Sequence, residues 1–201
     1  MDRMENQPKP RRSADGGLQN TVLSYLHDLV FLLTGLLFVF VLLFRIVVVS
    51  GPSMRTTLLD GDYLLVLSST LYQNPKQGDV IVASKDSFKD GEPIVKRVIA
   101  TAGQKVDIDF ELGTVYVDGD ALDEPYTLTP TNMQEGTNFP LVVEEGCLFV
   151  MGDNRNESKD SRHPDIGLID KREVLGKVFL LLIPGKDSAT DMRDFGRIGA
   201  V

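Results

Sequence analysis

A serine in a constrained turn is the first residue of this sequence that could do chemistry. Ser53 lies within Ser50-Gly51-Pro52-Ser53-Met54, directly after a long apolar run. Gly51 and Pro52 favour a tight and exposed backbone, which would let the hydroxyl attack a peptide while the Ser53 amide donates to an oxyanion. The same residues would also suit a plain linker, so this interpretation depends on finding a base.

A lysine on an apolar strand is one candidate for that base. Lys96 lies within Ile94-Val95-Lys96-Arg97-Val98-Ile99. Alternate residues of a strand share a face, so Lys96 groups with Ile94 and Val98. A lysine accepts a proton only when its amine is neutral, and burial among aliphatic side chains favours that form. The alternative is an edge-strand lysine that discourages aggregation.

A histidine is the other candidate base. His163 lies in Arg162-His163-Pro164-Asp165 and could complete a Ser-His-Asp arrangement, although a histidine before a proline is more typical of a surface turn. His27 precedes most of the apolar run and is excluded, because it would lie on the wrong side of a membrane. Cys147 is the single cysteine, so the sequence excludes an internal disulfide and the usual Cys/His zinc site. We expect no metal and no cofactor.

A polar segment, Gly152–Arg162, follows a strongly apolar strand and could support the site. It carries acidic, basic and hydroxyl side chains. One interpretation is a solvated loop with a turn at Gly152-Asp153. The other is a supporting shell, in which Asp and Arg pairs brace the loop while a hydroxyl orients the base.

The elements that must position these residues begin with an apolar anchor. Residues 29–44 contain no charged side chain, and residues 29–49 would reach about 31 Å as a helix, which matches the hydrocarbon core of a bilayer. The run is apolar on all sides, which favours contact with lipid over a cleaved secretory signal or a buried core helix. A cytoplasmic N-terminus is favoured by the basic residues that precede the run, namely Arg3, Lys9, Arg11 and Arg12.

The chain after Val49 has the pattern of an antiparallel β domain. Short runs rich in β-branched residues alternate with turns, and Asp118-Gly119 is a strong hairpin signal. We therefore expect a mainly β fold preceded by one transmembrane helix. The expected strands are residues 63–67, 79–82, 94–99, 114–117, 147–151 and 178–183.

The composition agrees with such a domain and excludes other classes. Of the 201 residues, 42% are hydrophobic and 25% are charged, which is typical of a globular protein. The net charge is −8 and no basic run is present, so the chain has no electrostatic footprint for nucleic acid. The expected parts are a cytoplasmic tail (1–25), a transmembrane helix (26–49), a catalytic domain (50–186) with a loop-rich or inserted subdomain at about 106–146, and a polar tail (187–201).

Four stretches, in this order and at these spacings, resemble the type I signal peptidases, membrane-bound serine proteases that remove signal peptides from exported proteins. The resemblance extends from the apolar run to about Pro184 and implies the β-rich fold that this family shares with self-cleaving repressors. The stretches are Ser50-Gly51-Pro52-Ser53-Met54, Gly78-Asp79-Val80-Ile81-Val82, Lys96-Arg97-Val98-Ile99, and Gly152-Asp153-Asn154-Arg155 with Ser158, Asp160, Ser161 and Arg162.

The resemblance implies a role for each matching residue. Ser53 would be the nucleophile and its amide an oxyanion donor, with Lys96 as the general base and Ser158 holding the Lys96 amine in place. Supporting roles are implied for Asp153, Asp160 and Arg162. Pockets for small side chains, which imply cleavage after Ala-x-Ala, would be lined by Val49, Met54, Leu58 and Val95.

Some positions depart from the family pattern. Gly51 stands where some relatives have a serine that adds a second oxyanion donor. Thr56 replaces the proline of a Pro-Thr-Leu sequence, and Ala102 and Gln104 replace residues of a Pro-Gly-Asp turn. Asn156-Glu157 stands where Asp-Asn is common. These differences concern loop stiffness and substrate preference and leave the expected catalytic residues in place.

The resemblance implies a membrane-bound serine endopeptidase that uses a Ser/Lys dyad. Its partners would be the signal peptides of exported preproteins, membrane lipid and the export translocon. It would be a single-pass protein of the cell membrane whose catalytic domain is extracytoplasmic. Two other functions fit the sequence: a membrane-tethered β domain that binds exported proteins without catalysis, and a protease of the same fold with a narrow client.

Overall fold

A computed structural model of the chain describes residues 14–187 and 190–201. The chain divides into two compact units, Met1–Val41 and Leu42–Val201. The basic residues that favour a cytoplasmic N-terminus lie outside the described residues, and these are Arg3, Lys9, Arg11 and Arg12.

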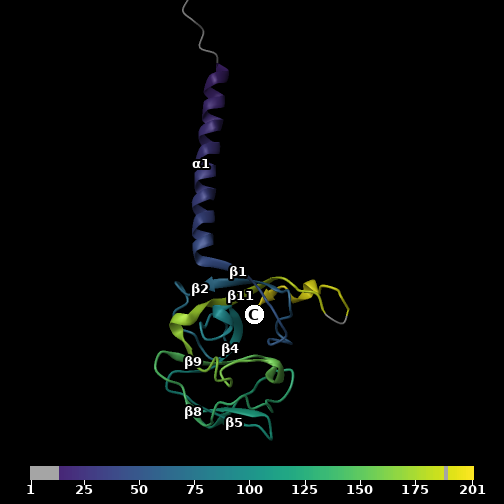
Figure 1. Cartoon of the computed structure of the whole chain (residues 1–201). Coiled ribbons are helices and arrows are strands. Elements are labelled where there is room, and N and C mark those ends of the chain that lie inside the picture. Colours follow the sequence, from purple (N-terminus) through teal and green to yellow (C-terminus); the bar gives the residue numbers. More distant parts are fainter. Residues whose placement is uncertain (1–13, 188–189) are drawn as a thin grey trace, which may run out of the picture. The chain divides into compact units, whose positions relative to one another are not determined.

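One long helix, α1 (Ala14–Leu43), accounts for the described part of the first unit (Figure 1). Its segment Asn20–Leu43 has a mean hydropathy of 2.4 and no buried residue. Its 24 residues are long and apolar enough to cross a membrane. The predicted apolar helix is therefore present.

The helix ends at Leu43, earlier than the boundary at Val49 that the sequence predicts. Phe44–Val48 forms strand β1 instead. Ile46, Val47 and Val48 are β-branched and suit a strand, and β1 pairs antiparallel with β2 (Tyr63–Ser68). Backbone pairing with β2 therefore decides the conformation of this segment, whose hydropathy alone does not separate it from the helix.

Two antiparallel sheets build the second unit, which confirms the expected mainly β fold. The larger sheet has the strand order β1-β2-β11-β3-β4-β9-β10, and β12 pairs with β11. The smaller sheet has the order β7-β6-β5-β8. The remaining strands are β3 (Val80–Ala83), β4 (Ile94–Thr101), β5 (Lys105–Asp109), β6 (Thr114–Val117), β7 (Asp120–Ala121), β8 (Leu141–Val142), β9 (Cys147–Met151), β10 (Ile169–Asp170), β11 (Val174–Ile183) and β12 (Gly199–Ala200). Within the described residues, four short 3-10 helices lie between strands, at Lys89–Gly91, Arg155–Glu157, Lys171–Glu173 and Phe195–Arg197.

The smaller sheet lies in the segment expected to be an inserted subdomain, between β4 and β9. It lies at the opposite end of the unit from β1 and β2 (Figure 1). A shared apolar cluster joins the two sheets, because Ile99 and Phe149 of the larger sheet pack with Val106 and Val115 of the smaller one. The insertion therefore shares a core with the strand that carries Lys96.

A second apolar cluster lies under the segment that carries Ser53. Met54 and Leu58 pack there with Leu64, Val66 and Val178, and all five side chains are buried. Burial of two large apolar side chains on the turn that follows Ser53 fixes that turn to the sheet. The apolar pattern on both sides of the serine therefore positions it.

The C-terminal segment, predicted to be a polar tail, is partly folded onto the larger sheet. β12 pairs with β11 through Leu180–Ala200 and Leu181–Gly199. Val201 packs against the same apolar cluster as Met54. The polar composition of residues 187–201 does not predict this contact, because much of the ordering comes from backbone pairing with β11 and from the ion pair between Arg197 and Asp62.

Candidate active site

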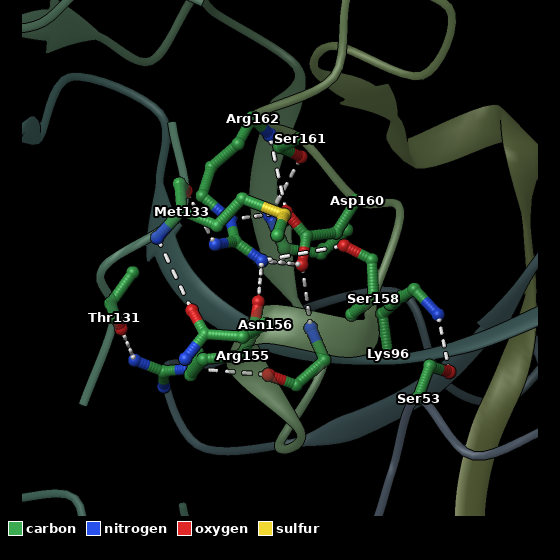
Figure 2. Close-up of polar contacts among 12 residues, drawn as sticks. Ser53, Lys96, Thr131, Met133, Arg155, Asn156, Ser158, Asp160, Ser161 and Arg162 are labelled. Atoms are coloured by element: carbon green, nitrogen blue, oxygen red, sulfur yellow. Dashed lines mark hydrogen bonds and ion pairs between the residues drawn. The ribbon is translucent and has the colours of Figure 1, made fainter. Parts of the chain in front are cut away.

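A hydrogen bond joins the serine and the lysine that the sequence selects. Lys96 Nζ lies 2.8 Å from Ser53 Oγ (Figure 2). Lys96 is 5% exposed, and its Nζ also donates to the carbonyl of Val95 at 3.1 Å. The structure therefore brings a nucleophile candidate and a nearly buried amine into direct contact.

The segment between β1 and β2 forms a closed loop that holds Ser53, and we call residues 50–62 the nucleophile loop. Its ends are joined by backbone hydrogen bonds from Val49 N to Asp62 O and from Gly61 N to Val49 O, both 2.9 Å long. The Asp60 carboxylate accepts from the Gly51 amide at 2.8 Å. Gly51 has a φ of 92°, a conformation that favours glycine.

A backbone clamp from the distant polar segment fixes the serine itself. The amide of Asn154 donates to the Ser53 carbonyl at 3.0 Å, and the Asn154 side chain donates to the Pro52 carbonyl at 3.2 Å. Sequence reasoning missed this role of Asn154. The available signal was its place in the polar segment that resembles the last family motif.

An ion pair next to Lys96 braces the same two segments. Arg97 follows Lys96 on β4 and binds both carboxylate oxygens of Asp153, with Nε–Oδ1 at 2.8 Å and Nη2–Oδ2 at 2.7 Å. The Thr57 hydroxyl donates to Asp153 Oδ2 at 2.5 Å. Asp153 is completely buried, so its charge is balanced by Arg97 rather than by water. Arg97 and Thr57 are supporting residues that the sequence did not single out.

A second ion pair stabilises the polar segment from within. Arg162 binds both carboxylate oxygens of Asp160 at 2.8 Å, and both side chains are completely buried (Figure 2). Arg162 also donates to the Arg155 carbonyl at 2.6 Å, and Asp160 accepts from the Gly152 amide at 3.0 Å. Through these contacts with the backbone of Gly152 and Arg155, the ion pair stabilises the conformation of the polar segment.

Ser158 does not make the contact with Lys96 that the resemblance implies. Its side chain is 3% exposed, and its Oγ is buried without a hydrogen-bond partner among the described residues. The side chain packs against Gly152, where an added Cβ would lie 2.2 Å from Ser158 Oγ. The amine of Lys96 is directed to Ser53 and to the Val95 carbonyl instead.

A group of aromatic and charged side chains connects Arg97 and Arg155 to the segment between β7 and β8. Tyr126 lies under the Arg97 guanidinium at 4.0 Å and near that of Arg155 at 5.9 Å. The Tyr126 hydroxyl donates to Glu124, which also pairs with Arg155. Burial and the nearby Glu124 carboxylate raise the pKa of Tyr126 above its ordinary value, so it stays a neutral donor.

The Gly78-Asp79 motif lies directly before β3 and contacts both the sheet and Arg97, whose Nη1 donates to the Gly78 carbonyl at 2.9 Å. Asp79 accepts hydrogen bonds from the Tyr72 hydroxyl, the Lys177 amine and the Lys76 amide. Burial opposes ionisation of Asp79, but the hydrogen bonds from Lys177, Tyr72 and Lys76 outweigh it and hold its pKa below the ordinary value. The motif therefore joins β3 to β11.

A cleft of about 350 Å³ opens beside Ser53 and Lys96. Val49, Met54 and Val95 line it, as the resemblance implies. Leu58 does not, because the turn that bonds Leu58 N to Met54 O directs its side chain into the core, where it is completely buried. Further lining residues that the sequence did not indicate are Val47, Phe88, Pro93 and Ile94.

The histidine alternative finds no support in the geometry. His163 Nδ1 accepts from the Asp165 amide at 3.2 Å within its own turn. It does not line the cleft that contains Ser53 and Lys96. Among the described residues, no group of three or more His, Cys, Asp or Glu side chains is arranged to hold a metal ion.

Comparisons with known proteins show the family to which the chain belongs. The family model "Signal peptidase, peptidase S26" matches residues 22–183. Signal peptidase I of Bacillus licheniformis is 32% identical over 174 residues, covering 83% of this chain and 91% of the relative. A probable signal peptidase I-1 of Synechocystis is 36% identical over 144 residues, covering 68% and 69%. A crystal structure of a signal peptidase I from Enterococcus faecalis is 29% identical, with a TM-score of 0.43, and covers 52% of this chain and 97% of that one.

These matches first define the class: the chain is a serine peptidase, a hydrolase. Within that class, the chain belongs to the signal peptidase family, peptidase S26. The predicted resemblance to the type I enzymes of this family is thereby confirmed.

Proposed function

We propose that this protein removes N-terminal signal peptides from exported preproteins with Ser53 as nucleophile and Lys96 as general base. The observation that carries the proposal is the 2.8 Å contact between Lys96 Nζ and Ser53 Oγ in an open cleft. Family membership supports the reaction, and the contact supports the assignment of roles. Ser-Lys pairs are a variant of the nucleophile–base arrangement in serine hydrolases.

The first half of the reaction forms an acyl-enzyme. Neutral Lys96 takes the proton from the Ser53 hydroxyl as Ser53 Oγ attacks the scissile carbonyl carbon. The carbonyl oxygen becomes an oxyanion, and the Ser53 amide donates to it. The C–N bond then breaks, the Lys96 ammonium returns its proton to the leaving amine, and the mature protein departs.

The second half hydrolyses the acyl-enzyme. Lys96 takes a proton from water, the hydroxide attacks the ester carbonyl, and the Ser53 oxygen leaves with the proton that Lys96 returns. Ser158 is proposed to accept a hydrogen bond from Lys96 while the amine is charged. Its buried hydroxyl, which has no partner among the described residues, supports this role.

The cleft walls support a preference for small residues before the cut. Val49, Met54 and Val95 present apolar surface next to the catalytic pair, and a cleft of this kind suits Ala-x-Ala. The apolar helix α1 supports attachment to the cell membrane by a single span. We propose that the N-terminus is cytoplasmic, that the catalytic domain is extracytoplasmic, and that lipid and the export translocon are its neighbours.

The test is cleavage of a preprotein with an Ala-x-Ala site by the full chain in detergent or lipid, with the new N-terminus identified by mass spectrometry. Ser53→Ala and Lys96→Ala should each lower kcat by about 10⁴-fold or more while the protein stays folded. Lys105→Ala, an exposed lysine on β5, is the matched control and should retain kcat. Full activity of Lys96→Ala would overturn the assignment of Lys96 as the base. So would a result in which His163→Ala is inactive while Lys96→Ala remains active.

A further inference from the structure

The C-terminal segment reaches the nucleophile loop through one arginine. Arg197 lies in the 3-10 helix Phe195–Arg197, directly before β12. Its guanidinium contacts Asp62 and Thr57, which both belong to the nucleophile loop. The mechanism proposed above does not use this contact.

Asp62 is the group that the arginine neutralises. The Asp62 side chain is completely buried and accepts from the Leu59 amide at 2.7 Å and from the Gly185 amide at 2.6 Å. Arg197 supplies the remaining donors, with Nη1–Oδ1 at 3.1 Å and Nη2–Oδ2 at 2.7 Å. A buried carboxylate without its cation is strongly unfavourable, so loss of Arg197 would disturb the packing of Asp62 and of the loop that carries it.

The same guanidinium also holds the backbone between Asp62 and Ser53. Arg197 Nη2 donates to the Thr57 carbonyl at 3.1 Å. The Thr57 side chain in turn donates to Asp153, the partner of Arg97. Thr57 is therefore fixed on its backbone side by the C-terminal segment and on its side-chain side by the ion pair next to Lys96.

A second contact ties the same segment to the start of the loop. Gly185 packs so closely that an added Cβ would lie 2.1 Å from the Asp60 carbonyl. The Asp60 carboxylate accepts from the Gly51 amide, two residues before Ser53. Two residues of the C-terminal segment therefore contact the end of the nucleophile loop: Gly185 packs against Asp60 and donates to Asp62, and Arg197 binds Asp62.

We propose that Arg197 is a positioning residue of the active site, which holds the nucleophile loop so that Ser53 meets Lys96. The proposal rests on the assignment of Ser53 as nucleophile. Arg197 acts through Asp62 and Thr57 and does not line the cleft, so it should affect the chemical step more than substrate binding. A displacement of the nucleophile by a fraction of an ångström lowers kcat, because the reaction depends on near-attack geometry.

The experiment compares Arg197→Ala and Arg197→Lys with Arg172→Ala in the full chain, on the same preprotein. Arg172 is the matched control, because it forms an ion pair with Asp170 but is 90% exposed. Each kinetic measurement is made at least 15 °C below the variant's own Tm, which is measured by circular dichroism. We expect Arg197→Ala to lower kcat about 10-fold or more with KM within about 3-fold of the wild-type value. Arg172→Ala should change neither.

The conservative variant separates positioning from simple stabilisation. Arg197→Lys keeps the positive charge and should recover most of the lost Tm. An ammonium lacks the planar fork that spans both Asp62 oxygens and the Thr57 carbonyl, so kcat should stay about 3-fold or more below the wild-type value. If Arg197→Ala fails to fold, the kcat of Arg197→Lys alone tests whether Arg197 positions Ser53.

Three outcomes would count against the proposal or its basis. Wild-type kcat in a folded Arg197→Ala, or in Arg197→Lys if the alanine variant is unfolded, would reduce Arg197 to a stabilising residue and overturn the proposal. A raised KM with unchanged kcat would also overturn it, because it would indicate a role in substrate binding. Activity in Ser53→Ala would instead refute the function proposed above, whatever Arg197 does.

Discussion

Gly152 offers a way to displace Ser53, the proposed nucleophile, without removing its hydroxyl or the amine of Lys96. It follows β9 directly and packs between the Ser53 carbonyl and the Ser158 side chain. A Cβ added there would lie 2.4 Å from the Ser53 carbonyl oxygen and 2.2 Å from Ser158 Oγ. Gly152 does not have the positive φ that would by itself exclude a side chain. The substitution Gly152→Ala therefore tests packing against the active site and not backbone conformation.

The size of the effect follows from these distances. Ordinary van der Waals contact with a Cβ begins at 3.4 Å, so the Ser53 carbonyl would have to retreat by about 1 Å. A misplacement of about 1 Å can lower the rate about 100-fold, which corresponds to about 2.7 kcal/mol in the activation free energy. Overpacking at a buried site costs a further 1–3 kcal/mol or so of folding stability. We expect Gly152→Ala to fold, with reduced Tm and kcat about 100-fold lower.

The assay measures kcat and KM on a preprotein together with thermal unfolding, and Gly176→Ala is the control. A Cβ on Gly176 in β11 would lie 2.1 Å from the Leu67 carbonyl, so the collision is as severe but falls on β2. Gly176→Ala should lose stability and, well below its Tm, keep kcat near the wild-type value. If the folded Gly152→Ala enzyme kept kcat within about 3-fold of wild type, the claim that this glycine fixes the position of Ser53 would be refuted.

Three further predictions concern charge. Because only the neutral Lys96 amine can take a proton, kcat/KM should rise with pH, and a flat profile from pH 6 to 9 would contradict a lysine base. Asp153→Asn leaves Arg97 without its buried partner and should lower the free energy of unfolding by about 3–5 kcal/mol in urea titrations; a loss below about 1 kcal/mol would contradict the role of this pair. The pKa of Asp79 is lower in the folded chain than its ordinary value, so its stabilising effect is present above that ordinary value and is lost as pH falls through the folded one. The free energy of unfolding should therefore fall less at acidic pH in Asp79→Asn than in the wild-type protein. Identical pH dependence in the two proteins would count against this interpretation.

Much of the fold could be predicted, because strands and the apolar helix leave strong local patterns. The segments around Lys96 and Phe149 are rich in β-branched and aromatic residues, and both are strands in the structure. The helix end could not be located, because Phe44–Val48 is as hydrophobic as the helix before it. The decision depends on pairing with β2, which is a contact between distant residues.

The candidate site could be predicted where a residue's type indicates its chemistry. It could not be predicted where a role depends on contacts that only the folded chain creates. Ser53 and Lys96 could be named as candidates from their types and surroundings and were selected by the resemblance of four ordered motifs to a known family, and the structure places them in contact. Asn154 holds Ser53 through its backbone amide, which every residue except proline carries, so its residue type did not indicate this contact and only its place in the last motif pointed to it. The contact of Arg197 with Asp62 was equally hidden, because an arginine in a polar segment is indistinguishable from a solvated one.

The clamp on the Ser53 carbonyl has a consequence for when this enzyme becomes competent during its biosynthesis. Ser53 is held by Asn154, and Asp62 of the same loop is held by Gly185. A ribosome produces these partners long after the serine, and non-local contacts of this kind form only once both segments are available. A growing chain that already contains Ser53 therefore lacks an ordered candidate site, and the proposed proteolytic activity can arise only after synthesis has passed Gly185.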